Sequence, residues 1–270
     1  EYKRELANLF GWFADTQSDL GQLDSAIATR QSQISFVERL IAAGKSDATL
    51  QARLMPAHEG LGILLSSRGS REEGIAQYRL AVAQGKSLLA IDPSNNEWRD
   101  VTTNAQLELA KGLLALGRTA EANEELSAAC AVADSLRAHD PKVFRWQLLE
   151  TNCLSMSAQL ALASGADSDA LRFAQRAVAA ARSERSGDPI SDSYTIAAAY
   201  RLLGDTYERN GDAERAAGAW AAGLAQLPNK VTERPWETNE HAALLRRSGK
   251  TNEAAPLSRR LDAMGYHSLI

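Results

Sequence analysis

Small apolar residues recur at fixed positions along this chain, on both sides of short polar turns. A glycine marks each turn, and successive turn glycines are separated by 48, 48, 48, 46 and 38 residues. The residue seven positions before each turn glycine and the residue five positions after it are always Ala or Gly. Two antiparallel helices need such small side chains at matched heights in order to approach closely. The turn glycines, each at the centre of a predicted helical hairpin, are Gly21, Gly69, Gly117, Gly165, Gly211 and Gly249.

Local signals define where the helices of each hairpin begin and end. A glycine suits the left-handed residue that terminates a helix, and a polar residue shortly after it can cap the next helix. These predicted caps are Asp24, Ser70, Thr119, Asp167, Asp212 and Thr251. Ser70 and Glu73 have the spacing of a capping box.

Asp-Pro pairs repeat with the same period and predict the end of each second helix. A proline disfavours helical geometry in the residue before it and has no amide hydrogen to donate. The pairs are Asp92-Pro93, Asp140-Pro141 and Asp188-Pro189, and Trp98, Trp146 and Tyr194 follow them at one fixed offset. We therefore expect two helices of about 20 residues in each unit.

The fifth hairpin shows a family resemblance. Its large and small residues follow the tetratricopeptide repeat (TPR) order: Tyr200, Leu203-Gly204, Tyr207, Ala216, Trp220 and Pro228. The chain thus resembles a TPR protein, although its 48-residue period exceeds the family's 34. This long form is similar to helical arrays appended to larger bacterial signalling or effector proteins.

The resemblance implies an all-α fold, a right-handed α-solenoid of about six antiparallel helical hairpins in one domain, 1–270. The expected hairpins span 1–46, 47–93, 94–141, 142–189, 190–228 and 235–265.

Three departures from the repeat pattern carry further expectations. Arg30 stands where later units have Tyr78, Leu126 or Trp220, which predicts that the first hairpin is a polar cap of the array. Pro56 falls within a first helix and should either kink it or delay its start. The last hairpin is short, should cap the other end, and should finish its final helix at Gly265.

Charge and hydropathy exclude two classes of partner. The net charge is −4, with 30 Lys and Arg dispersed among 34 Asp and Glu, so no basic footprint for nucleic acid is present. No apolar run approaches the roughly 20 residues of a spanning helix, so this segment should not insert into a membrane. Because the sequence begins at Glu1, we expect an excised or processed region. A cytoplasmic location is favoured, and a periplasmic one would need a signal or anchor elsewhere in the chain.

Cys130 and Cys153 have neither the spacing nor the companion histidines of a zinc site. We expect buried apolar thiols, because free cysteine is among the most buried residue types. The two cysteines lie equally far from the turn centred between Pro141 and Lys142, which should place them at the same height on adjacent helices. Whether they are bridged stays open.

The sequence contains no recognisable catalytic constellation, and we expect no enzyme, cofactor or metal site. The four histidines are scattered. His139-Asp140 is the one adjacent histidine–carboxylate pair, and its position in an inter-helix turn favours a solvated loop. Gly60-Leu61-Gly62 lacks the preceding strand of a dinucleotide loop, and hairpin packing explains its glycines.

Polar residues at one phase of the first helices are the candidate binding residues. Asn8, Asn104 and Asn152 each lie thirteen positions before a turn glycine. An asparagine amide can pair with both the donor and the acceptor of a peptide backbone. The alternative is that these residues are solvated or act as local caps.

A second set follows two helical turns later: Asp15, Lys111, Gln159 and Asp205 share a phase, and Arg201 and Glu208 flank Asp205 at helical spacing. Their mixed charges do not favour a wholly anionic peptide. Surface ion pairing of Arg201 with Glu208 is the alternative for that pair.

Together these features predict a non-catalytic scaffold that binds a protein or peptide in a concave groove, as the interaction or regulatory region of a larger protein. The alternative is a sensor of a small peptide or metabolite that switches an attached output domain. Self-association through an exposed end of the array is a further possibility.

Overall fold

The computed structural model describes residues 2–45, 48–183, 186–229, 231–232 and 234–268, with the side chains of residues 2–4 and 45 excepted. Within these ranges the regular structure is helical and no strand is present. The chain divides into two compact units, residues 1–117 with 263–270, and residues 118–262. The predicted all-α fold class is confirmed in the described residues.

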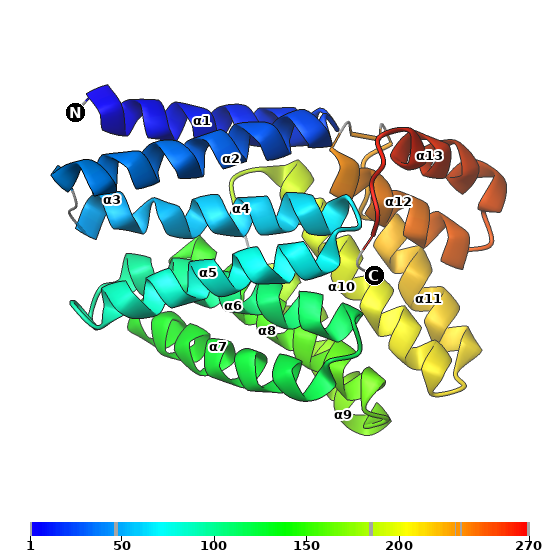
Figure 1. The fold of residues 1–270 in the computed structure, drawn as a ribbon. Coiled ribbons are helices and arrows are strands. Elements are labelled where there is room, and N and C mark those ends of the chain that lie inside the picture. Colours follow the sequence, from blue (N-terminus) through cyan, green and yellow to red (C-terminus); the bar gives the residue numbers. More distant parts are fainter. Residues whose placement is uncertain (1, 46–47, 184–185, 230, 233, 269–270) are drawn as a thin grey trace. The chain divides into compact units, whose positions relative to one another are not determined.

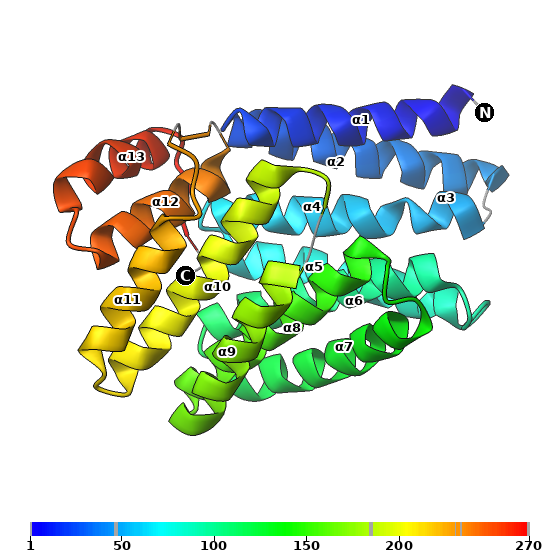
Figure 2. The ribbon, with the colours of Figure 1, turned by 180° about the vertical axis from the view of Figure 1, so that it is seen from behind.

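The first unit contains α1 to α6 and the C-terminal segment (Figure 1). The helices are α1 (Tyr2–Asp19), α2 (Leu23–Leu40), α3 (Ala48–Ala52), α4 (Leu54–Ser67), α5 (Arg71–Leu89) and α6 (Asn96–Ala115), and the segment Ile41–Lys45 after α2 is kinked at Gly44, whose φ is 73°. Within the unit α1 packs on α2, α2 on α4, α4 on α5, and α5 on α6. Figure 2 shows α1, α2 and α4 side by side from behind.

The second unit continues the same alternation of helices. It contains α7 (Thr119–His139), α8 (Phe144–Ala163), α9 (Asp167–Ser183), α10 (Pro189–Arg209), α11 (Ala213–Leu224), α12 (Pro235–Arg247) and α13 (Thr251–Ala263). Each helix from α7 to α12 packs on a neighbour within the unit. The expected length of about 20 residues holds for α5 to α8 and α10, while α11 to α13 have only 12 or 13 residues.

The turn glycines adopt the backbone conformation that the sequence predicts. All six have positive φ angles between 73° and 87°, and Gly265 after α13 also has a positive φ of 61°. Side chains with a Cβ atom rarely adopt this conformation, so each glycine ends its helix at little steric cost. The expectation for Gly265 is confirmed as well.

The capping residues differ from the prediction at several ends. Asp212 does cap α11, because its carboxylate accepts a hydrogen bond from the amide of Arg215 at 3.0 Å. Ser70 is the N-cap residue of α5 but makes no side-chain capping bond, so the predicted capping box is wrong. Asn95, which the sequence analysis did not single out, caps α6 by accepting from the amide of Trp98.

The Asp-Pro pairs do not all act as helix stops. Asp188 is the N-cap of α10, accepting from the amides of Ile190 and Ser191, and Pro189 is its first residue. This is the position where proline is best tolerated in a helix, because its missing amide hydrogen would have no partner there. The third pair therefore begins a helix, and α9 has already ended at Ser183.

Glycine lets the helices of a hairpin approach closely. A Cβ atom added to Gly62 on α4 would lie 2.6 Å from the ring of Tyr78 on α5 and 3.0 Å from the carbonyl oxygen of Gly74. One added to Gly204 on α10 would lie 2.3 Å from the indole of Trp220 on α11. These are the large-against-small contacts that the repeat pattern predicts.

Pro56 coincides with a break in the helix that contains it. Regular helical hydrogen bonding is interrupted at Arg53, between α3 and α4, and Pro56 is the third residue of α4. Proline is tolerated in the first turn of a helix because the backbone nitrogens there have no hydrogen-bond acceptor within the helix. Because the helical segment already begins at Ala48 and resumes at Leu54, an interrupted helix is the observed outcome, and its start is not delayed.

The first hairpin is not the polar cap that Arg30 predicted. Arg30 is only 5% exposed, and its guanidinium binds Asp15 on α1 and Gln33 on α2 within the hairpin. The outward side of α1 instead carries exposed Trp12 and Phe13. The reason for the error is that a long arginine side chain can be buried when its terminal nitrogens find hydrogen-bond acceptors inside the protein.

Cys130 and Cys153 form a disulfide bond between α7 and α8, with their Cα atoms 5.6 Å apart. The predicted juxtaposition at one height is confirmed, and the expectation of free apolar thiols is wrong. Close approach of two helices brought the thiols within bonding distance, which burial statistics cannot indicate.

The C-terminal segment lies along the turns of the first unit. The amide of His267 donates to the carbonyl oxygen of Ser67 at 2.6 Å, and Arg68 donates to the carbonyl oxygen of Gly265 at 3.1 Å. Tyr266 packs on Leu64 and its neighbours. No helix among the described residues is both long and apolar enough to cross a membrane.

Candidate peptide-binding surface

First helices lie beside one another inside each unit, as predicted. In the first unit α4 packs on α6, and in the second α8 packs on α10 and α10 on α12. Residues at one phase of these helices are thereby brought into rows. The candidate residues divide between the units, with Asn8, Asn104 and Lys111 in the first and the others in the second.

The asparagines of the first unit bind side chains of neighbouring first-helix segments. Oδ1 of Asn8 accepts a hydrogen bond from Arg53, which precedes α4 directly, and Nδ2 of Asn104 on α6 donates to Glu59 on α4. Both asparagines are partly buried. Each amide therefore helps to join successive repeats, using one of its two polar atoms in these contacts.

The other candidates on these helices are also partly buried. Lys111 forms an ion pair with Glu108 one helical turn earlier, at 3.5 Å. Asn152 and Gln159 lie on α8, seven residues apart, which places them on the same side of that helix. The role of these residues in binding stays a prediction.

Arg201 is the centre of a buried ionic network in the second unit. Its Nε donates to Oε1 of Glu240 on α12 at 2.6 Å, and Nη1 donates to Asp205 one turn later on α10 at 3.3 Å. Arg201 is 5% exposed and Glu240 is 4% exposed. The guanidinium is thus partnered below the surface, and Glu208, the alternative surface partner, is exposed.

Asp205 joins three helices through a single carboxylate. It accepts a hydrogen bond from Nε1 of Trp220 on α11 at 3.0 Å, and Arg247 at the end of α12 donates to both of its oxygens. With Arg201, these contacts satisfy the carboxylate from α10, α11 and α12. A bidentate arginine and an indole donor hold it in a fixed orientation.

The network keeps the arginine charged. Burial acts to lower the pKa of Arg201, but the charges and hydrogen bonds of Glu240 and Asp205 outweigh it, so the pKa is raised. The charged guanidinium contacts side chains of α10 and α12, which makes the cluster a joint between repeats. Glu240 was missed by the sequence analysis, yet it lies nine positions before Gly249, where α10 has the buried Leu202 at the equivalent distance from Gly211. A glutamate at a repeat position that is otherwise apolar and buried is itself a signal, because a buried carboxylate needs a cation beside it.

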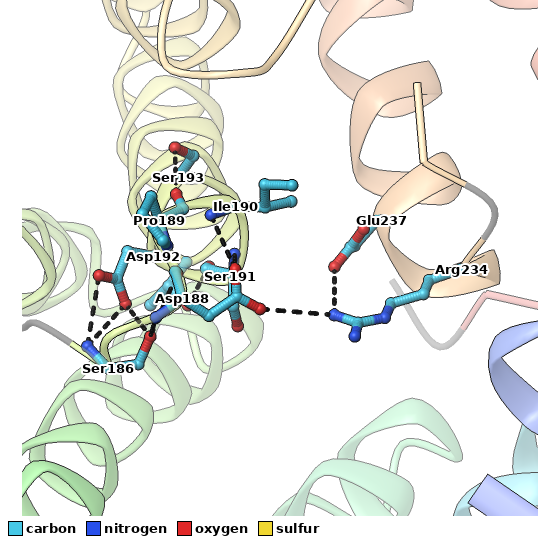
Figure 3. A network of polar contacts seen from close by, with 10 residues as sticks. Ser186, Asp188, Pro189, Ile190, Ser191, Asp192, Ser193, Arg234 and Glu237 are labelled. Atoms are coloured by element: carbon cyan, nitrogen blue, oxygen red, sulfur yellow. Dashed lines mark hydrogen bonds and ion pairs between the residues drawn. The ribbon is translucent and has the colours of Figure 1, made fainter. Parts of the chain in front are cut away.

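A second polar cluster lies where α10 and α12 begin (Figure 3). Arg234 lies between Asp188 and Glu237, at 3.9 Å and 3.1 Å from their carboxylate oxygens. The side chain of Glu237 is fully buried, and that of Asp188 is about half exposed. Ser186 donates to Asp192 in the same cluster. These contacts fix the two helix starts together.

A hollow of about 590 Å³ lies beside the Arg201 network. Its floor is the apolar side of α11, and its rim is the turn between α12 and α13, with Arg247 and Lys250 as cations. The lining residues are Ala217, Ala221, Leu224, Ala225, Arg247, Ser248 and Lys250. In the part of the chain that is described, no group of three or more His, Cys, Asp or Glu side chains could hold a metal ion.

Solved structures share this arrangement of helices. BtubC from P. vanneervenii is 18% identical, with 91% of this chain and 94% of that chain covered at a TM-score of 0.57. A Rap protein complexed with competence and sporulation factor is 14% identical, with 97% and 78% covered at 0.56. NprR in complex with its cognate peptide NprX is 12% identical, with 96% and 70% covered at 0.58.

This chain has the TPR-like fold. No family model matches the sequence, and no curated protein sequence matches it significantly. At these identities the likeness concerns the TPR-like fold alone, because one repeat fold serves many functions. The assignment agrees with the resemblance of the fifth hairpin.

Proposed function

We propose that this TPR-like chain is a non-catalytic scaffold that binds a protein or peptide through the polar side chains of its first helices. The observation that carries the proposal is the pair of amides on neighbouring first-helix segments. Asn8 uses Oδ1 and Asn104 uses Nδ2 in contacts with the next repeat. The remaining amide atom of each can then pair with a peptide backbone group.

The solved neighbours support this type of ligand. The Rap protein was crystallised with competence and sporulation factor, and NprR with its cognate peptide NprX. Both cover nearly all of this chain with the same type of helical repeat. A peptide in the groove formed by the first helices is therefore the ligand class that we propose here. The proposed scaffold needs no cofactor.

The test is a triple variant, Asn8→Ala with Asn104→Ala and Asn152→Ala. Affinity capture from the source cell with the wild-type chain identifies the partner, and calorimetry with the purified partner then compares the two proteins. Loss of interfacial hydrogen bonds costs about 1–3 kcal/mol each, so binding should weaken at least tenfold. Asn252→Ala, on the exposed start of α13, is the matched control.

Two results would contradict the proposal. If the triple variant binds the partner as tightly as the wild type does, the amides are not the binding groups. If the triple variant loses its helical circular dichroism, the amides serve the joints between repeats instead. The single variant Asn152→Ala, outside the contacts between repeats described for Asn8 and Asn104, then tests whether an amide at this position contributes to binding of the partner.

A sensor of a small peptide or metabolite is the second candidate, and the hollow beside α11 favours it. Its volume of about 590 Å³ lies in the usual range for small-molecule sites. Ala221→Trp would fill the hollow from the exposed side of α11. This change should abolish binding of a small ligand and leave a first-helix partner bound.

A further inference from the structure

The first helix of the chain carries an apolar face that its own hairpin does not cover. Ala7 and Ala14 of α1 are fully buried, whereas Leu9, Trp12 and Phe13 are 53%, 66% and 59% exposed. Large apolar residues thus point outward and small ones inward. Single exposed apolar residues are ordinary, but three on one side of a helix mark an interaction site.

The same register positions form the joint between hairpins elsewhere in the chain. Leu9, Trp12 and Phe13 lie twelve, nine and eight positions before Gly21. The equivalent residues of α10, before Gly211, are Ala199, Leu202 and Leu203, which are buried in one cluster with Ala174, Val178 and Ala181 of α9. The face of α10 that packs on the preceding hairpin is therefore the face that α1 exposes.

Two other hairpins show the same relation. Ala57 and Leu61 of α4, twelve and eight positions before Gly69, are buried in one cluster with Ile34 and Val37 of α2. Cys153 of α8, twelve positions before Gly165, is bonded to Cys130 of the preceding helix α7. The exposed side of α1 therefore occupies the register positions that α4, α8 and α10 use to pack on the preceding hairpin.

This face is bulkier than its counterparts. Trp12 stands where α4 has Gly60, and Leu9 where α4 has Ala57. An array that ended at α1 would present polar residues there, as capping repeats do. The outward residues of α13, such as Asn252 and Arg259, are polar and exposed. The exposed side of α13 is thus polar, whereas that of α1 is apolar.

We propose that the face of α1 made by Leu9, Trp12 and Phe13 binds the same face of a second copy of this chain. A two-fold contact needs only one self-complementary patch. Head-to-tail growth would need an apolar partner surface on α13, and its outward side is polar. Asp15, an exposed carboxylate on α1, is already paired with Arg30, so its charge is compensated inside the hairpin.

The size of the face sets the strength of the contact. Leu9 to Phe13 covers just over one helical turn, and one helix crossing buries less than the roughly 800 Å² per partner of a standard stable interface. The dimer should therefore be weak and concentration-dependent. Of the proposed peptide-binding asparagines, Asn104 on α6 and Asn152 on α8 lie outside this face of α1, so the proposed function and the dimer can fail separately.

Sedimentation velocity of the full chain over a hundredfold concentration range tests the proposal. The wild type should shift reversibly from monomer to dimer. Trp12→Ser with Phe13→Ser should weaken the dimer at least tenfold. Ile91→Ser, which removes a 68% exposed side chain just after α5 in the same unit, is the matched control and should dimerise as the wild type does.

Three outcomes would overturn the proposal: a wild type that stays monomeric throughout, a double variant that dimerises normally, and a control that loses the dimer equally. A monomeric wild type whose α1 face binds a different protein belongs to the first case. Circular dichroism verifies that the double variant folds. If it does not, Leu9→Ser replaces it, and normal dimerisation of that folded variant counts against the proposal.

Discussion

Nε of Arg201 on α10 lies 2.6 Å from Oε1 of Glu240 on α12, and both side chains are almost completely buried. The bond joins the first helices of successive hairpins, and Asp205 supplies a second carboxylate to the same guanidinium. Such pairs give little net stability when complete, because removing both charges from water is costly. Losing one member leaves the other charge buried and unpaired.

Arg201→Met should accordingly destabilise the second unit strongly. Glu240, 4% exposed, would lose its cation, and an uncompensated buried charge costs about 3–5 kcal/mol. Glu240→Leu should cost less, because Arg201 retains Asp205. The free energy of unfolding from urea titrations measures both.

The double variant Arg201→Met with Glu240→Leu is the control for this pair. It should be more stable than Arg201→Met alone, since no glutamate then lacks a partner. A loss in the double variant equal to the sum of the two single-variant losses would show that the pair is not coupled.

Gly62→Ala should destabilise the second hairpin. The added methyl group would lie 2.6 Å from the Tyr78 ring and 3.0 Å from the carbonyl oxygen of Gly74, so the helices must separate. Overpacking of this kind costs about 1–3 kcal/mol. Thermal unfolding followed at 222 nm, the usual helix band, measures the change.

Gly218→Ala on α11 is the matched substitution for Gly62→Ala. A Cβ atom at Gly218 would meet no neighbouring atom within 4 Å. Alanine should therefore raise the stability there, by about 0.5–1 kcal/mol, through its better helix propensity. If both substitutions act in the same direction, close approach at Gly62 is not the reason for its glycine.

The sequence was sufficient for the hairpins because their determinants are local and periodic. A left-handed residue at Gly117 or Gly165 requires glycine whatever surrounds it. Small residues such as Ala158 and Ala170 must stand at fixed distances from each turn. These restraints repeat, so a single chain reveals them without any alignment.

The sequence was insufficient where the outcome depends on a distant partner. Arg30 was expected to be polar surface, yet its two terminal nitrogens donate to Asp15 and Gln33 inside the hairpin. Glu240 was overlooked because its cation, Arg201, is 39 residues away. The repeat register marks Glu240 as a packing position, but the choice of its cation arises from tertiary packing. The ligand of the candidate binding residues could not be predicted either, because it is a separate molecule that the sequence does not describe.

Lowering the pH should destabilise the last hairpin through His241. Burial holds the pKa of this histidine below its usual value of 6.5, against a weaker opposite effect of Glu253. The unfolded chain then binds a proton that the folded chain resists, so stability is lost as the pH falls through about 6.5 toward the lowered folded pKa. Urea midpoints at about pH 7.5 and pH 5.5 measure this loss.

His241→Gln isolates that contribution from those of the other histidines. The variant should lose less stability than the wild type between these two pH values, because glutamine does not titrate. Identical pH dependence in the two proteins would show that His241 is as easily protonated in the folded chain as in the unfolded one.

Reduction of the Cys130–Cys153 bond should destabilise the second unit without changing its fold. The bond closes a loop with a sequence separation of 23 residues. In the chain-entropy description, a loop of this size contributes about 3 kcal/mol by restricting the unfolded state. Urea unfolding with and without dithiothreitol should show this difference, and peptide mapping by mass spectrometry confirms the bond itself.

The double variant Cys130→Ser with Cys153→Ser should be insensitive to the reductant and about as stable as the reduced wild type. Its helical circular dichroism should match that of the oxidised chain, because α7 and α8 also pack through other side chains. A persistent disulfide needs an oxidising compartment. If the oxidised and reduced wild-type proteins unfold at the same urea concentration, the bond does not restrain the unfolded chain, and its entropic contribution to stability is refuted.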